Sequence, residues 1–90
     1  MQTKLFIGGE FVDGLAGGTI PVFNPYSGEI ICEIAEARAE DVDRAVTAAK
    51  AAQFAWGRAD AADRGNLLLK LADAIDAHAD ELIELEALDT

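Results

Sequence analysis

Few side chains in this sequence are of the types that carry out catalysis. The only cysteine is Cys32 and the only histidine is His78, in different halves of the chain. A thiol becomes a good nucleophile when a nearby base or positive charge lowers its pKa, and a structural zinc site takes four ligands. We therefore expect Cys32 to be a small apolar residue on a buried strand face. His78 is expected to be a capping or solvent-exposed residue at a helix junction.

The acidic pairs and the glycines do not form a recognisable site either. Carboxylate pairs such as Asp73 and Asp76 fall on polar helix surfaces, where they are expected to be solvated. Neither G-x-G-x-x-G after a strand nor G-x-x-x-x-G-K-[ST] occurs, and the glycine pairs at 8–9 and 17–18 favour turns. The sequence thus predicts no catalytic and no cofactor-binding residue.

Residues 1–34 have the composition of strands and turns. They hold six of the eight glycines and both prolines, whereas all but one of the alanines lie at position 35 or later. The apolar runs 5–7 and 11–12 around a Gly-Gly pair predict a β-hairpin. A loop over 13–18, an extended stretch over 19–23, a turn at 24–28 and a returning strand over 29–34 follow.

The returning strand should be two-sided, because side chains alternate between the faces of a strand. Ile30, Cys32 and Ile34 are predicted on one face, and Ile31 and Glu33 on the other.

Residues 39–90 read as three helices. The first is predicted over 39–54, with Glu40 and Asp41 favourably placed at its N-terminal dipole, and is closed by Trp56 and Gly57. The second should begin with Asp60 as N-cap, and the third should follow His78. The second helix carries an apolar stripe formed by Leu67, Leu68, Leu71 and Ile75. Leu68 and Leu71 are expected to be buried against neighbouring helices in a complete fold.

Length and charge exclude several classes of protein. Ninety residues make about one small domain. A net charge of −10, from 17 acidic and 7 basic residues, argues against nucleic acid and anionic membranes as partners. No apolar run approaches the roughly 18 residues of a membrane span, and no signal peptide is expected. One cysteine rules out an internal disulfide framework and suits a reducing cytoplasm.

The order of these elements resembles the start of the NAD(P)-dependent aldehyde dehydrogenase superfamily. The similarity runs through nearly all of the sequence and is carried by the segments LFIGGEFV (5–12), VFNPYSGE (22–29), AEDVDRAV (39–46), Trp56, DRG (63–65), LAD (71–73) and LEALDT (85–90). The sequence departs from the family at Arg38, where a Thr or Ser often stands that could cap the first helix.

The resemblance implies an α/β fold: two hairpin-like strand pairs and then three helices, forming the N-terminal segment of a Rossmann-like cofactor-binding domain. By the same resemblance, the complete enzyme oxidises an aldehyde to a carboxylic acid with NAD or NADP and assembles as a homodimer or homotetramer. The catalytic cysteine, the glutamate and the cofactor loop of the family would all lie downstream of Thr90. Residues 1–90 alone would then be an incomplete, inactive part of the NAD(P)-binding domain.

One binding site of the family can be matched to positions in this sequence. Many members bind a structural Na⁺ or K⁺ through backbone carbonyls before the Asn-Pro turn and through an Asp of an L-D-x-G-K segment. The resemblance places these ligands at Val22, Phe23 and Asp89. Oxygen ligands with one carboxylate suit such a hard cation. In the alternative interpretation, Asp89 simply ends a helix and the turn carbonyls bind water.

Two other functional interpretations remain. The chain could be an autonomous acidic helical module for protein interaction, or an independent small enzyme. The small-enzyme interpretation has no nucleophilic side chain paired with a general base in the sequence to support it.

Overall fold

The computed structural model describes residues 1–90 and contains two hairpins followed by three helices, as the sequence predicts. The elements are β1 (Leu5–Ile7), β2 (Glu10–Val12), β3 (Thr19–Phe23), β4 (Ile30–Ala35), α1 (Ala39–Arg58), α2 (Ala61–Ala77) and α3 (Ala79–Asp89). Each hairpin is a separate two-stranded antiparallel sheet. None of the helices is both long enough and apolar enough to cross a membrane.

The first hairpin turns at its glycine pair, as predicted. Gly8 and Gly9 have φ angles of 61° and 83°. Two positive φ angles in succession are the requirement of a tight type I′ hairpin turn, and glycine meets it without steric cost. Phe6 stands opposite Phe11, with ring centroids 5.0 Å apart. The hairpin lies beside α1, where a Cβ on Gly8 would be 3.8 Å from that of Ala48.

The second hairpin departs from the predicted alternation along its returning strand. Val22 pairs with Cys32 but Phe23 pairs with Ile30, so Ile31 is an extra residue in a β-bulge. Ile31 and Cys32 are consequently both half-buried and line the same pocket, whereas Ile30 is 59% exposed. The prediction that Ile30 shares the face of Cys32, with Ile31 opposite, was wrong because the bulge shifts the alternation.

The first helix is longer than the sequence predicts. It continues through Trp56 and Gly57 and ends at Arg58. Gly57 keeps a helical backbone without the positive φ of a glycine that terminates a helix. Ala59, in extended conformation, ends α1, and the Arg64 guanidinium donates hydrogen bonds to the carbonyls of residues 56, 57 and 59. The predicted N-cap position of Asp60 is confirmed, although its side chain makes no capping hydrogen bond.

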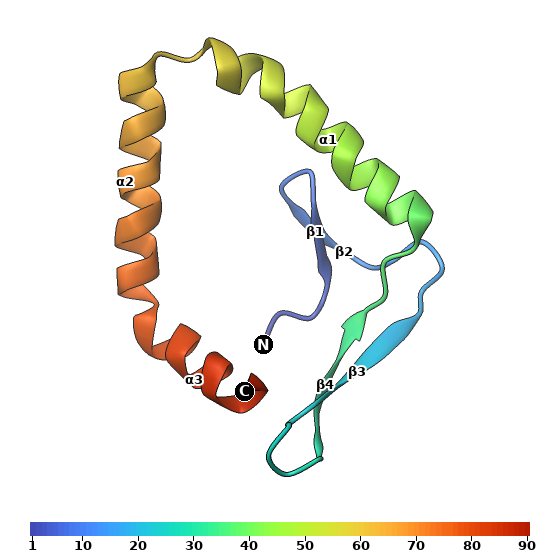
Figure 1. The fold of residues 1–90 in the computed structure, drawn as a ribbon. Helices are drawn as coiled ribbons and strands as arrows, with labels where there is room; N and C mark the ends of the chain where they lie inside the picture. The colour runs from blue at the N-terminus through green and yellow to red at the C-terminus, as the bar shows by residue number, and fades with distance from the viewer.

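The three helices form an open arc around the first hairpin, with the two chain termini near each other (Figure 1). We call α1, α2 and α3 together the helical arch. The molecule measures 48 × 33 × 16 Å. Only Gly14 and Asp41 are buried, and no apolar side chain is. Leu68 and Leu71 remain 58% and 55% exposed, so the other helices of this chain do not cover the apolar stripe of α2.

Candidate functional site

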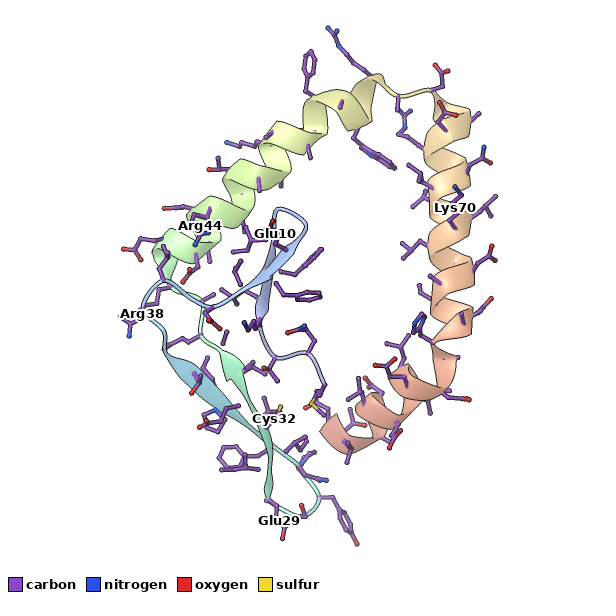
Figure 2. The ribbon with its side chains drawn as sticks, turned by 180° about the vertical axis from the view of Figure 1, so that it is seen from behind. Glu10, Glu29, Cys32, Arg38, Arg44 and Lys70 are labelled. Carbon is purple, nitrogen blue, oxygen red and sulfur yellow. The ribbon has the colours of Figure 1, made fainter.

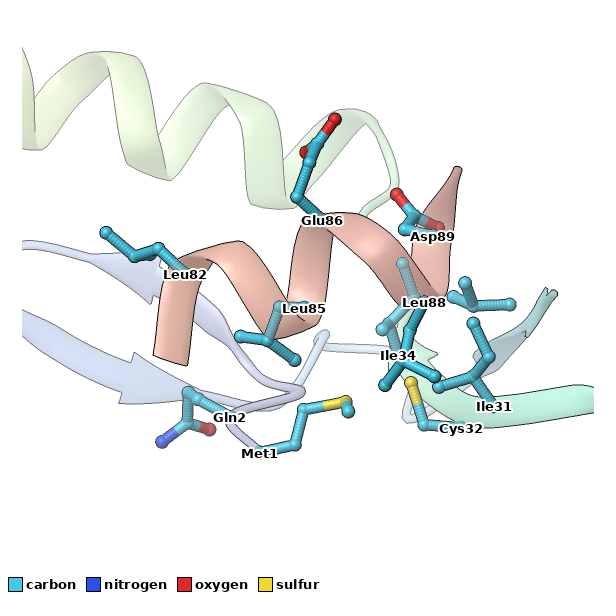
Figure 3. A pocket seen from close by; sticks show the side chains of 11 residues that line it. Met1, Gln2, Ile31, Cys32, Ile34, Leu82, Leu85, Glu86, Leu88 and Asp89 are labelled. Atoms are coloured by element: carbon cyan, nitrogen blue, oxygen red, sulfur yellow. The ribbon is translucent and has the colours of Figure 1, made fainter. Parts of the chain in front are cut away.

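A pocket of about 400 Å³ lies between α3, the second hairpin and the first residues of the chain. Eight of its eleven lining residues are hydrophobic. Figure 3 shows Leu82, Leu85 and Leu88 on α3, with Met1 and Cys32 across the space from them. The carboxylates of Glu86 and Asp89 are on the same helix. The pocket is therefore apolar along its length and has acidic groups on one wall.

The pocket brings together two of the three predicted cation ligands. Val22 of β3 and Asp89 of α3 both line it, whereas Phe23 does not and is 54% exposed. Asp89 is the last residue of α3, where free helix carbonyls already create negative potential. A carboxylate there is unfavourable without positive charge nearby. The Asp89 carboxylate is an oxygen ligand of the kind that a hard cation takes, and a bound cation would supply that charge.

The turn after Val22 and Phe23 is held by its own side chains. The Asn24 Oδ1 accepts hydrogen bonds from the backbone N–H groups of Tyr26 and Ser27, at 2.8 and 3.3 Å. Gly28 then takes a φ of 74°, and its N–H donates to the Asn24 carbonyl at 2.8 Å. This Asx turn fixes the backbone that follows the two proposed carbonyl ligands.

The structure places the two chemically versatile residues apart. Cys32 lies in the middle of β4 (Figure 2) and is half-buried, not fully buried as predicted, because only the pocket side of the strand is partly covered. His78 is exposed between α2 and α3, as predicted. Its Nδ1 lies 2.8 Å from the Ala74 carbonyl oxygen, so the ring is engaged with the end of α2. His78 is not among the residues around Cys32 in the pocket.

Side chains alone do not assemble a metal centre. No group of three or more His, Cys, Asp or Glu residues lies close enough to hold a metal ion. The predicted cation site uses backbone carbonyls and one carboxylate, so it stays a prediction.

Sequence reasoning missed that one charged side chain of the molecule is buried. It identified Asp41 only as an acidic residue near the start of a helix, yet its side chain is 1% exposed. Its carboxylate accepts the N–H of Arg38 at 2.9 Å and that of Leu15 at 3.0 Å. Asp41 thus satisfies the N–H of the N-cap residue Arg38, which is the acidic half of a capping box, while the Arg38 side chain makes no capping hydrogen bond. An acidic residue three positions after the N-cap was the available signal. No pattern in the sequence indicates the hydrogen bond from Leu15 to Asp41.

Known proteins resemble this chain in both sequence and fold. The sequence pattern of the aldehyde dehydrogenase family matches residues 11–90. A cytosolic 10-formyltetrahydrofolate dehydrogenase from Mus musculus is 48% identical over 91 residues, covering 99% of this chain and 10% of that protein.

Solved structures give the same result. A putative aldehyde dehydrogenase from Burkholderia cenocepacia superimposes with a TM-score of 0.96 at 57% identity, over 100% of this chain and 18% of that one. PnpE, known from Pseudomonas sp. WBC-3 and solved with nicotinamide adenine dinucleotide, gives a TM-score of 0.94 at 56% identity, over 98% of this chain and 18% of that one.

The chain therefore spans between a tenth and a fifth of the length of these relatives. Their structures contain the same two strand pairs followed by three helices. A family match over most of the sequence, with the fold matched along its whole length, shows that the chain belongs to the aldehyde dehydrogenase family.

Proposed function

We propose that this chain acts as the N-terminal portion of an aldehyde dehydrogenase, which oxidises an aldehyde to a carboxylic acid and reduces NAD⁺ or NADP⁺. The observation that supports this most strongly is the agreement of the entire chain with a putative aldehyde dehydrogenase at a TM-score of 0.96. The nicotinamide cofactor accepts the hydride in this chemistry. NAD is favoured over NADP because PnpE was solved with NAD.

The contribution of these 90 residues would be structural. We place them in the NAD(P)-binding domain, as a scaffold that supplies neither the catalytic cysteine nor the cofactor loop. The exposed apolar side chains support this role. Leu67, Leu71 and Ile75 of α2 are each at least half exposed. An apolar face of this size on a helix calls for a packing partner.

We further propose a structural Na⁺ or K⁺ held by the backbone carbonyls of Val22 and Phe23 and by the Asp89 carboxylate. The shared pocket of Val22 and Asp89 and the negative end of α3 support this assignment. The bound cation would supply the positive charge that balances Asp89. It would also join the end of α3 to the second hairpin.

We propose the assembly from the family resemblance and the location from the names of the relatives. We expect a homodimer or homotetramer in the cytoplasm. The Mus musculus relative is described as cytosolic, although an aldehyde dehydrogenase from Rattus norvegicus that is 47% identical over 89 residues is mitochondrial. Sedimentation of the purified protein and fractionation of its cells would measure both properties.

The central test is enzymatic. The protein at its natural length should reduce NAD⁺ when given an aldehyde and form the corresponding acid. The 90-residue chain alone should show no such activity, and Cys32→Ala in the natural protein should leave the rate unchanged. Turnover by the pure 90-residue chain that Cys32→Ala abolishes would overturn the proposal and would favour the small-enzyme alternative.

The same preparation tests the cation. Replacing Na⁺ and K⁺ by a large organic cation should lower the melting temperature of the parent protein more than that of Asp89→Asn. Equal changes in the two proteins would contradict the site without affecting the proposed activity.

A further inference from the structure

Asp41 is unusual in this molecule because it is a charged side chain with almost no solvent exposure. Its exposed fraction is 1%, whereas most of the large apolar side chains are half exposed. Burying a carboxylate is costly unless hydrogen-bond donors surround it. Its surroundings therefore have to compensate the charge, and they do so through the backbone.

The donors come from two separate parts of the chain. The Leu15 N–H, in the segment that links the two hairpins, donates to Oδ1 at 3.0 Å. The Arg38 N–H, at the N-cap of α1, donates to Oδ2 at 2.9 Å. Each carboxylate oxygen thus receives one backbone donor. The side chain joins a backbone group 26 positions away in sequence to the first turn of the helix.

A glycine completes this arrangement. Gly14 is buried beside the carboxylate, and a Cβ at this position would overlap the Glu36 carbonyl oxygen and lie 3.5 Å from Asp41 Oδ2. The linking segment can approach β4 and α1 this closely only without a side chain at position 14. A further hydrogen bond, from the Glu36 N–H to the Gly18 carbonyl at 3.0 Å, ties the other end of the segment to the same strand end.

The charges around the site favour an ionised carboxylate. The hydrogen bond from Arg38 and then that from Leu15 lower the pKa of Asp41 below its usual value, against the opposing effect of burial. The positive charges of Arg44 and Arg38 also lower the pKa of Asp41.

The other charged groups nearby are acidic or already paired. Glu36 places a carboxylate oxygen beside Gly18, and Asp13 lies 3.9 Å from the Lys4 ammonium. Glu40 and Asp43 flank Asp41 on α1 and are exposed. The hydrogen bonds of the Asp41 carboxylate go to Leu15 and Arg38 instead.

We propose that Asp41 is a positioning residue whose ionised carboxylate holds the Asp13–Gly18 segment against the first turn of α1. This contact fixes how the two hairpins sit relative to the helix. It does so with directional hydrogen bonds in a chain that has no buried apolar core of its own. The proposal concerns this junction and holds whether or not the proposed activity is correct.

The test is native-state amide hydrogen exchange in the protein at its natural length, comparing Asp41→Asn with Asp43→Asn. An amide side chain has one acceptor oxygen and one NH₂ donor, so the Asp41→Asn side chain can accept only one of the two backbone N–H groups in the present geometry. The Leu15 or Arg38 amide should then exchange roughly tenfold faster or more. Asp43→Asn removes the same charge from an exposed position of the same helix turn and should leave both amides unchanged.

The pH dependence distinguishes a charged contact from simple packing. A carboxylate with a lowered pKa stabilises the native state above its unfolded pKa, and this contribution is lost as the pH falls through the folded value. Protection of the Leu15 amide in the parent should therefore decrease below about pH 3.8, the ordinary value for this group. In Asp41→Asn this acid-dependent loss should disappear, while Asp43→Asn should follow the parent.

Two results would overturn the proposal. One is equal protection of Leu15 and Arg38 in both variants. The other is an acid-induced loss at Leu15 that is the same in Asp41→Asn as in the parent. If Asp41→Asn does not fold, the parent alone decides: selective acid loss at Leu15 and Arg38, with α2 amides still protected, supports the proposal. Parallel loss at all of these amides contradicts it.

Discussion

The junction around Asp41 and the helical arch are held in opposite ways. At the junction, a buried carboxylate and a buried glycine connect three segments through hydrogen bonds of 2.9–3.0 Å. In the arch, successive helices meet only end to end, and the Arg64 guanidinium secures the bend between α1 and α2. Directional polar contacts within the chain thus define the junction, whereas no apolar packing within the chain defines the arch.

The difference shows where the stability of this fold has to originate. Ordering a residue costs about 1–2 kcal/mol in backbone entropy, and burial of apolar surface is the main term that offsets it. Leu71 and Ile75 of α2 and Leu82 of α3 are 55%, 50% and 47% exposed. A few hydrogen bonds at the junction contribute about 1 kcal/mol each, which is too little to order three helices.

The largest expected effect is on the isolated 90-residue chain. Because it lacks a buried apolar core, we predict that it is partly disordered or self-associating, despite a charge of −10 that favours solubility. Ultracentrifugation should show concentration-dependent association or an expanded species, and amide exchange should be fast throughout α2 and α3.

The contrary result would be informative. A strict monomer with strongly protected amides in the hairpins and the arch would show that the 90 residues fold by themselves. That outcome would favour the protein-interaction module over a portion of a longer enzyme.

A smaller but local effect is expected at the apolar stripe of α2. In the protein at its natural length, Leu71→Ala should cost about 2–5 kcal/mol, because Leu71 is proposed to pack against chain outside these residues. Leu69 serves as the matched control. It is 66% exposed and lies nearly opposite Leu71 around the helix, so Leu69→Ala should change the melting temperature far less. An unchanged melting temperature for Leu71→Ala would show that the stripe is assigned to the wrong face.

The elements could be predicted well from the sequence because their signals are local. The glycine pair at 8–9 fixes the first turn, and Asn24 with Gly28 fixes the second. Alanine content and apolar spacing located the helices. These patterns depend on near neighbours, so a single sequence is sufficient to recognise them.

What the sequence did not predict depends on distant contacts or on small changes of register. The bulge at Ile31 changes the faces of Ile30 and Ile31 relative to Cys32, and no glycine or proline within β4 marks it. The hydrogen bond from Leu15 to Asp41 connects the segment between the two hairpins to α1. That Val22 and Asp89 lie near one another was expected only through the family resemblance, since residues so far apart show no pattern of their own.

The smallest expected effect tests the corrected end of α1. In the structure Gly57 is a helical residue in the last turn of α1, and a Cβ added to it would have no other atom within 4 Å. Replacing an exposed helical glycine by alanine stabilises a protein by about 0.5–1 kcal/mol, because alanine loses less backbone entropy on folding. Gly57→Ala should therefore raise the melting temperature slightly in the protein at its natural length.

Gly28→Ala is the contrasting control, because a φ of 74° disfavours any side chain there and the substitution should lower the melting temperature. If Gly57 instead closed the helix with a left-handed backbone, Gly57→Ala would be destabilising like Gly28→Ala. The sign of the change thus decides between the helix end predicted from the sequence and the one in the structure.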